Sequence, residues 1–143
     1  MKRFSDRLVE SIRKVGNPCV VDLDPRIDLM PAFVKTGRGR PTKKIVRSVI
    51  RDFHELVLDA VADLVPAVKP QLAFFEQYGS AGIEAFEDTV LAARQRGLLV
   101  IADGKRNDIT STAEAYAEAF LGESEVLGEK QKAFDADAMT VTP

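Results

Sequence analysis

Apolar residues recur at two different spacings along this chain, and segments of the two kinds alternate. Leu8, Ile12 and Val15 repeat at the interval of one helix face, and Gly16 ends that run. Short apolar runs closed by a carboxylate or a proline are typical of strands buried on both faces. The pattern predicts helices over residues 5–16, 45–64, 80–97 and 111–122, and strands over residues 19–24, 65–69, 98–103 and 137–143.

Alternating strands and helices imply a parallel sheet whose strands are joined by helical crossovers. Two architectures fit this order: a doubly wound open sheet, and part of a (β/α)8 barrel. The sequence contains neither G-x-G-x-x-G nor G-x-x-x-x-G-K-[ST], the motifs of nucleotide-binding open sheets, and this disfavours the first architecture. A complete barrel needs roughly 250 residues. We therefore predict an α/β fold, the first half of a (β/α)8 TIM barrel with about four β/α units, in which residues 1–143 form a single domain.

Charge and composition exclude several classes of function. The chain carries 20 Lys and Arg residues against 22 Asp and Glu residues, whereas nucleic acids and anionic membranes call for a basic excess. Its apolar runs are far shorter than the ~20 residues of a membrane helix, and Asp6, Arg7 and Glu10 interrupt the apolar core that an export signal needs. The only cysteine, Cys19, can build neither a disulfide nor a zinc site by itself, and we expect it to be a buried core residue. These features predict a cytoplasmic protein.

Charged side chains stand where the predicted strands end. Asp24, Lys69 and Asp103 close three consecutive strands, and Lys105 and Asp108 follow shortly after the third. Parallel strands bring their carboxyl ends to one edge of the sheet, where α/β proteins place their sites. Each of these residues alone could be a solvated residue at a strand end. Their recurrence on three strands favours a nearly neutral cleft suited to proton transfer without a metal, in which adjacent carboxylates keep each lysine in its ammonium form.

Several stretches of the sequence form longer motifs. Residues 103–109 read D-G-K-R-N-D-I and are followed by Thr112, and residues 69–76 read K-P-Q-L-A-F-F-E. The first stretch resembles the D-x-K-x-x-D-I-x-x-T signature of orotidine 5′-phosphate decarboxylases, and the second resembles a segment typical of one bacterial branch of that family. The first-strand and fourth-strand motifs of the same branch resemble residues 23–26 and residues 137–143.

The resemblance implies a role for each of the charged residues. Lys105 would be the general acid that protonates C6 of the pyrimidine as carbon dioxide leaves, and Asp103 would face the substrate carboxylate. Lys69 would pair with Asp103 and reach the ribose hydroxyls, which Asp24 would also contact. The resemblance also implies a homodimer with shared sites and no cofactor or metal. The residues that would project into the neighbouring subunit's site are Asp108, Ile109 and Thr112.

The chain departs from the family pattern at two positions and in length. Asn107 stands where the branch usually has glycine, and Asp22 stands where it has a small residue. Asp22 shares a face with Asp24, and the sequence indicates no partner for this further carboxylate. The family barrel has eight strands, whereas this chain reaches the fourth. Two alternatives therefore stay open: a related sugar-phosphate lyase that uses the same D-x-K-x-x-D residues around a magnesium ion, and a non-catalytic half-barrel that is a truncated product or an assembly partner of a missing half.

Other residues that could carry chemistry have simpler structural interpretations. We expect His54, on the long predicted helix, to be an exposed or hydrogen-bonded structural residue. Phe74 and Phe75 are expected to pack under a helix rather than stack on a base. Arg38 and Arg40 are expected to be solvated in a surface loop rather than to bind phosphate.

Overall fold

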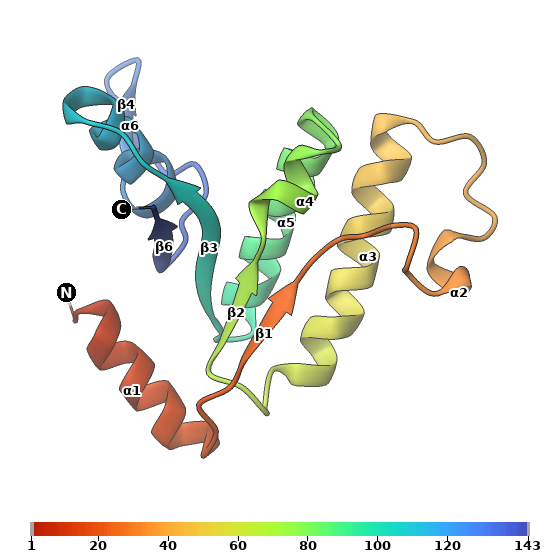
Figure 1. Cartoon of the computed structure of the whole chain (residues 1–143), viewed down its shortest axis with the longest axis horizontal. Coiled ribbons are helices and arrows are strands. Elements are labelled where there is room, and N and C mark those ends of the chain that lie inside the picture. The colour runs from red at the N-terminus through yellow and green to blue at the C-terminus, as the bar shows by residue number, and fades with distance from the viewer. Residues whose placement is uncertain (1, 143) are drawn as a thin grey trace.

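The computed structural model describes residues 2–142 and contains a four-stranded parallel sheet with helices packed against one side of it (Figure 1). The sheet has the order β1-β2-β3-β6, and a separate two-stranded hairpin is formed by β4 and β5. The strands are β1 (Val20–Leu23), β2 (Ala67–Pro70), β3 (Leu99–Arg106), β4 (Ser124–Val126), β5 (Glu129–Gln131) and β6 (Ala138–Val141). The helices are α1 (Phe4–Val15), α2 (Ala32–Lys35), α3 (Lys43–Val61), α4 (Leu72–Glu76), α5 (Ser80–Gln95) and α6 (Thr110–Leu121).

The order and direction of the sheet strands confirm the predicted α/β architecture. All three pairings in the sheet, β1 with β2, β2 with β3 and β3 with β6, are parallel. The helices that connect the strands, among them α3, α5 and α6, lie on the outer side of the curved sheet (Figure 1). Helix α1 lies near the amino-terminal ends of the strands. All carboxyl ends of the sheet strands therefore meet at the same edge, as in a (β/α) barrel.

An apolar face of α3 packs against α5. Ile50 and Leu58 of α3 and Phe86 of α5 are completely buried. Burial of a side chain of this size stabilises the folded state by about 1.5–3 kcal/mol. Gly82 lets α5 approach α4 closely, because a Cβ atom at this position would lie 1.8 Å from the carbonyl oxygen of Phe75. Ion pairs between the two helices flank the apolar contact, and they join Arg47 to Glu84 and Asp88 and join Arg96 to Glu55 and Asp59.

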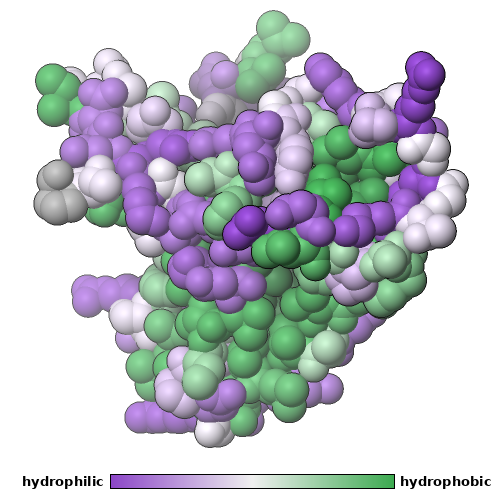
Figure 2. Space-filling model, turned by 45° about the vertical axis from the view of Figure 1, so that its right-hand side comes forward, coloured by the Kyte–Doolittle hydropathy of each residue, from purple (hydrophilic) through white to green (hydrophobic). Residues whose placement is uncertain are grey.

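Two expectations about the first strand are wrong. The run 19–24 was expected to be buried on both faces, but Val20 and Asp22 are exposed and only Leu23 is fully buried within β1. Cys19, expected in the core, is also exposed. The reason is that β1 is an edge strand and helices cover only one side of the sheet, so alternate residues of β1 face away from the core. Apolar side chains also gather over a broad area of the face drawn in Figure 2.

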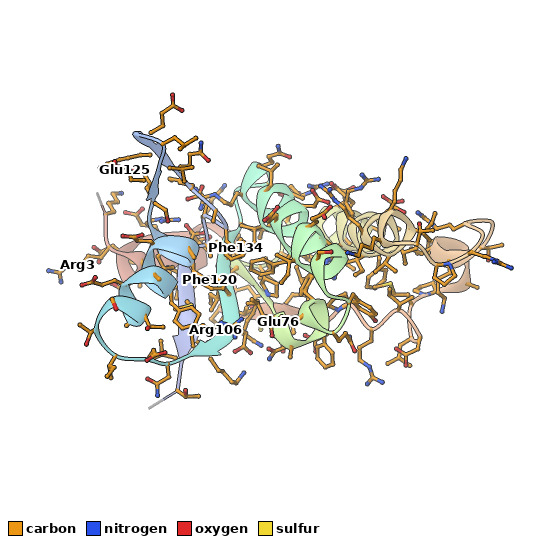
Figure 3. All side chains as sticks on the ribbon, turned by 90° about the horizontal axis from the view of Figure 1, so that it is seen from above. Arg3, Glu76, Arg106, Phe120, Glu125 and Phe134 are labelled. Atoms are coloured by element: carbon orange, nitrogen blue, oxygen red, sulfur yellow. The ribbon has the colours of Figure 1, made fainter. Side chains whose placement is uncertain are left out.

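The structure adds elements that periodicity did not reveal. The loop 25–41 contains the short helix α2, and the poorly patterned segment 122–136 contains the β4–β5 hairpin, which extends away from the rest of the fold (Figures 1 and 3). β3 continues to Arg106, three residues beyond its predicted end, with a register shift against β6 between Ala102 and Arg106. Short elements of this kind carry too few periodic positions to be recognised from the pattern.

Aromatic side chains form a continuous chain through the core. Phe75, expected under a helix, is fully buried in α4 and meets Phe86 of α5 edge to face at 5.4 Å between ring centroids. Phe86 in turn contacts Phe120 of α6 and Phe134, whose rings are 4.7 Å apart (Figure 3). Edge-to-face pairs of this kind add about 0.5–1.5 kcal/mol beyond the area they bury.

His54 adjoins this aromatic chain at Phe75, with 5.5 Å between the ring centroids, and it is a buried, hydrogen-bonded core residue. Its Nδ1 is 2.9 Å from Oγ1 of Thr89, and that hydroxyl donates its own hydrogen to the carbonyl oxygen of Ala85 at 2.7 Å. Nδ1 must therefore carry the hydrogen that it donates to Thr89. Nε2 is buried with no hydrogen-bond partner among the described residues. Burial lowers the pKa of His54 to about 4 because the charged imidazolium would lose its hydration.

This lowered pKa predicts that stability falls as the solution is acidified from pH 6.5 to pH 4. Over that range the unfolded chain, with a histidine pKa of about 6.5, binds a proton that folded His54 does not bind. We expect a loss of about 3 kcal/mol in the free energy of unfolding at pH 4 relative to neutral pH. Urea unfolding of the parent and of His54→Asn, which keeps a donor towards Thr89 but does not titrate, measures this contribution. Equal pH dependence in the two proteins would contradict the prediction.

Candidate active site

Asp103 is the centre of the charged cluster at the carboxyl edge of the sheet. It lies on β3, and its side chain is only 7% exposed. Its Oδ2 accepts hydrogen bonds from Nζ of Lys69 at 2.9 Å and from Nε2 of Gln71 at 2.8 Å. Its Oδ1 accepts hydrogen bonds from Nζ of Lys105 at 2.7 Å and from Oγ1 of Thr140 at 2.7 Å. Each carboxylate oxygen thus has one ammonium donor and one neutral donor.

The electrostatics of the cluster keep Asp103 ionised. Burial by itself would raise the pKa of Asp103, but the hydrogen bonds from Lys105, Thr140 and Lys69 outweigh it and hold that pKa far below the ordinary value. Burial by itself would likewise lower the pKa of Lys69, but its hydrogen bonds to Asp103 and Asp22 raise that pKa above its usual value. The site therefore contains a fixed carboxylate between two ammonium groups.

The structure supplies the partner that the sequence did not indicate for Asp22. Oδ1 of Asp22 lies 3.1 Å from Nζ of Lys69, because the β1–β2 register places these two residues opposite each other. Asp24 follows two residues later and is exposed. Burial raises the pKa of Asp24, and the neighbouring Asp22 carboxylate raises it further. Lys69 thus bridges Asp22 on β1 and Asp103 on β3.

Lys105 reaches the cluster through an unusual backbone conformation. Its φ is 47°, in the left-handed region that residues other than glycine rarely adopt. Lys105 therefore interrupts the extended conformation of β3, although its ammonium group still contacts Asp103. The lysine side chain remains 55% exposed to solvent.

Three of the predicted residues do not join the cluster. Asp108, Ile109 and Thr112 are exposed in the β3–α6 connection and the first turn of α6. The carboxylate of Asp108 accepts the backbone N–H of Ile109 at 2.8 Å, and Ile109 is 80% exposed. An apolar side chain with this exposure, beside an accessible carboxylate, leaves the loop available for contact with another molecule.

Arg106 supports the connection that carries these exposed residues. Its guanidinium binds the carboxylate of Glu76 on α4 and donates to the carbonyl oxygen of Gly104 at 2.8 Å. The guanidinium carbon also lies 5.8 Å from the ring centroid of Phe120 on α6 (Figure 3). Arg106 therefore ties the end of β3 to both α4 and α6.

Gln71 and Thr140 are the site residues that sequence reasoning missed. Gln71 lies within the K-P-Q-L-A-F-F-E stretch directly after β2, and Thr140 lies on β6. Both lie at or near the end of a sheet strand, so including neutral polar residues at strand ends among the candidates would have found them. Neither is charged, so a search for charge at strand ends passes over them.

Arg38 differs from the expectation of a solvated side chain. Its guanidinium donates to the carbonyl oxygen of Val34 at 2.6 Å, to Oγ of Ser48 at 3.0 Å and to Oδ2 of Asp52 at 2.7 Å. Its charge is thereby paired within the fold. Arg40 is exposed, as expected.

The part of the chain that the structure describes offers neither a metal-binding cluster nor a membrane-spanning helix. Within residues 2–142, His, Cys, Asp and Glu side chains do not gather in a group of three or more that could hold a metal ion. None of the helices described in the structure has the length and apolar character required to cross a membrane.

A parallel β/α sheet with charged residues at the carboxyl ends of its strands is the arrangement of (β/α)8-barrel enzymes. The sequence pattern of the family described as "Orotidine 5'-phosphate decarboxylase / HUMPS family" matches residues 31–143. The chain therefore belongs to this family.

Curated relatives and solved structures agree with that assignment. The chain is 43% identical to the orotidine 5′-phosphate decarboxylase of Rhodopirellula baltica and 40% identical to that of Caldicellulosiruptor saccharolyticus, in each case over 100% of this chain. These alignments cover 46% and 48% of the two relatives, so the chain spans about half their length.

Two similar solved structures are likewise about twice as long as this chain. A Streptomyces avermitilis protein assigned as an orotidine 5′-phosphate decarboxylase superposes with a TM-score of 0.70 at 37% identity, over 85% of this chain and 39% of that one. The Leishmania donovani OMP decarboxylase superposes with a TM-score of 0.66 at 26% identity, over 96% of this chain and 43% of that one. The sheet described above thus corresponds to half of a barrel.

Proposed function

We propose that this chain supplies the N-terminal half of a (β/α)8 barrel that converts orotidine 5′-phosphate to uridine 5′-phosphate and carbon dioxide. The observation that carries the proposal is the cluster of Lys69, Asp103 and Lys105, in which an ionised carboxylate lies between two ammonium groups at the carboxyl ends of β2 and β3. The names of the curated relatives support the same reaction. The proposal places residues 1–143 in a single domain and the protein in cytoplasmic pyrimidine biosynthesis, without a cofactor or a metal.

The cluster provides the proton and the negative charge that the reaction uses. When the bond between C6 and the substrate carboxylate breaks, its electron pair stays on C6 and neutral carbon dioxide leaves. Lys105, whose ammonium group contacts Asp103, gives one of its protons to C6. The Asp103 carboxylate faces the substrate carboxylate, and the repulsion between these like charges disappears as the substrate group becomes neutral.

The remaining charged residues orient the ribose. Lys69 has three ammonium hydrogens, of which two are directed to Asp22 and Asp103, and the third is available to a ribose hydroxyl. Asp24 lies on the same edge and accepts from the ribose hydroxyls. Holding the ribose restricts the position of C6 relative to Lys105 and so contributes to the rate through orientation.

Asp108, Ile109 and Thr112 act across a homodimer interface in this proposal. Their exposure in the β3–α6 connection is consistent with contact to a second subunit. α6, which follows them, has only Phe120 buried among its 12 residues, so most of its surface is available for the same contact.

The experiment that tests the function uses a chimeric barrel, in which residues 1–143 are followed by the C-terminal half of the Rhodopirellula baltica relative. We expect this protein to release carbon dioxide from orotidine 5′-phosphate, and we expect a chelator to leave the rate unchanged because the proposed chemistry uses no metal. A folded chimera that releases no carbon dioxide would contradict the proposal. Loss of turnover with chelator would favour the magnesium-dependent sugar-phosphate lyase chemistry.

A further inference from the structure

Thr140 connects the two residues on which the proposed chemistry depends. Its hydroxyl oxygen accepts the backbone N–H of Lys105 at 3.1 Å and donates its hydrogen to Oδ1 of Asp103 at 2.7 Å. The same Oδ1 also accepts a hydrogen bond from Nζ of Lys105 at 2.7 Å. One hydroxyl therefore links the backbone of Lys105 to the carboxylate that its side chain contacts.

The backbone of Lys105 needs such support. Its φ of 47° is sparsely populated for a residue with a side chain, and conformations of this kind persist only where the surroundings hold them. The β3–β6 register shifts between Ala102 and Arg106, so regular ladder pairing does not run through Lys105. The hydrogen bond to Thr140 takes the place of a ladder bond for the Lys105 N–H.

The position of Thr140 suits this role because β6 is the neighbour of β3. Thr140 is partly buried at the end of β6, with its hydroxyl between the Lys105 N–H and the Asp103 carboxylate. The other charged groups that face Asp103 and Lys105 come from the opposite side, where Lys69 bridges Asp22 and Asp103. Thr140 is therefore the contact that joins the β6 side of the site to this cluster.

We propose that Thr140 is a positioning residue, whose hydroxyl holds the left-handed turn at Lys105 and aligns the Lys105 ammonium group with Asp103. This inference rests on the proposed function only for the claim that Lys105 is the proton donor. The structural part, that Thr140 holds the backbone of Lys105, can be tested without any substrate.

The structural test measures hydrogen exchange of the Lys105 amide in the 143-residue chain. Thr140→Val keeps the shape of the side chain and removes the hydroxyl, whereas Thr140→Ser keeps the hydroxyl. We expect exchange at Lys105 to accelerate about 2- to 10-fold in Thr140→Val, which corresponds to the loss of one hydrogen bond, and to stay near the parent rate in Thr140→Ser. Thr142→Val, at an exposed position two residues away, is the matched control and should leave this amide unchanged.

The functional test uses the same variants in the chimeric barrel. If Thr140 positions the proton donor, Thr140→Val lowers kcat by about 10- to 100-fold with KM nearly unchanged, and Thr140→Ser restores most of kcat. Circular dichroism shows whether each variant keeps its secondary structure.

The outcomes separate this inference from the proposed function. Parent-like exchange at Lys105 in Thr140→Val, or a Thr140→Ser variant as defective as Thr140→Val, would overturn the role of Thr140. A chimera with no decarboxylase activity would overturn the proposed function, while the exchange rates would still decide whether Thr140 holds the turn.

Discussion

The 143-residue chain on its own is expected to show no turnover of orotidine 5′-phosphate. A C6 anion gains little stabilisation from the pyrimidine ring, so the barrier to be removed lies near the top of the enzymatic range, ~20 kcal/mol. Proton transfer from Lys105 accounts for only ~3–5 kcal/mol of it. The rest must come from preorganised charge and from binding energy of remote parts of the substrate, chiefly its phosphate. Barrels commonly bind phosphate in loops after strands 7 and 8, whereas the sheet within residues 2–142 consists of β1, β2, β3 and β6.

The same chain is expected to associate with itself. β1 and β6 are open edges of the sheet, and apolar side chains gather over a broad area of one face (Figure 2). Steady-state assays of the chain, purified free of host enzyme, should show no turnover, and light scattering should show species larger than a monomer. Turnover close to that of the chimeric barrel would mean that paired half-barrels rebuild the phosphate site, and the prediction would be wrong.

Replacing Lys105 by alanine in the chimeric barrel should reduce decarboxylation by at least about 10²–10⁴-fold. This is the usual contribution of general acid catalysis, and Lys105 is the group proposed to deliver the proton to C6. The fold should survive, because the Lys105 side chain is 55% exposed and alanine leaves no cavity there. Lys130→Ala, at an exposed position on the β4–β5 hairpin, is the matched control. Activity of Lys105→Ala within tenfold of the parent would refute the assignment.

Lys105→Ala also allows a test of the proposed shared site. Asp108→Ala should be inactive as well, if Asp108 acts in the neighbouring subunit's site. In a mixture of the two inactive variants, subunits exchange at random, and up to about a quarter of all sites would then have both residues intact. Part of the activity should therefore return. Mass spectrometry can show that subunits exchange. Exchange without recovery of activity would exclude a role for Asp108 in trans.

The local part of the site could be predicted from the sequence. The alternation of strands and helices follows from periodicities of 2 and 3.6 residues, which each segment carries within itself. The placement of Lys69 and Asp103 at one edge then follows from the rule that parallel strands end together. The structure places their side chains 2.9 Å apart.

The contacts across the sheet could not be predicted in the same way. Gln71 and Thr140 reach Asp103 from positions 32 and 37 residues away, and no periodic pattern marks such a pair. The left-handed turn at Lys105 coincides with the register shift between β3 and β6, two strands that lie far apart in the sequence, so no local pattern marks it.

The sequence by itself therefore determined the class of fold, the edge at which the charged residues lie and the family that they resemble. Only the tertiary structure decided which donors surround Asp103, that Asp22 pairs with Lys69, and that Cys19 is exposed while His54 is buried. The physical reason is that secondary structure is specified by neighbours along the chain, whereas burial and pairing depend on which strands and helices lie side by side. β1 is an edge strand with one side uncovered, and this position in the sheet, rather than its apolar sequence, sets the exposure of its residues.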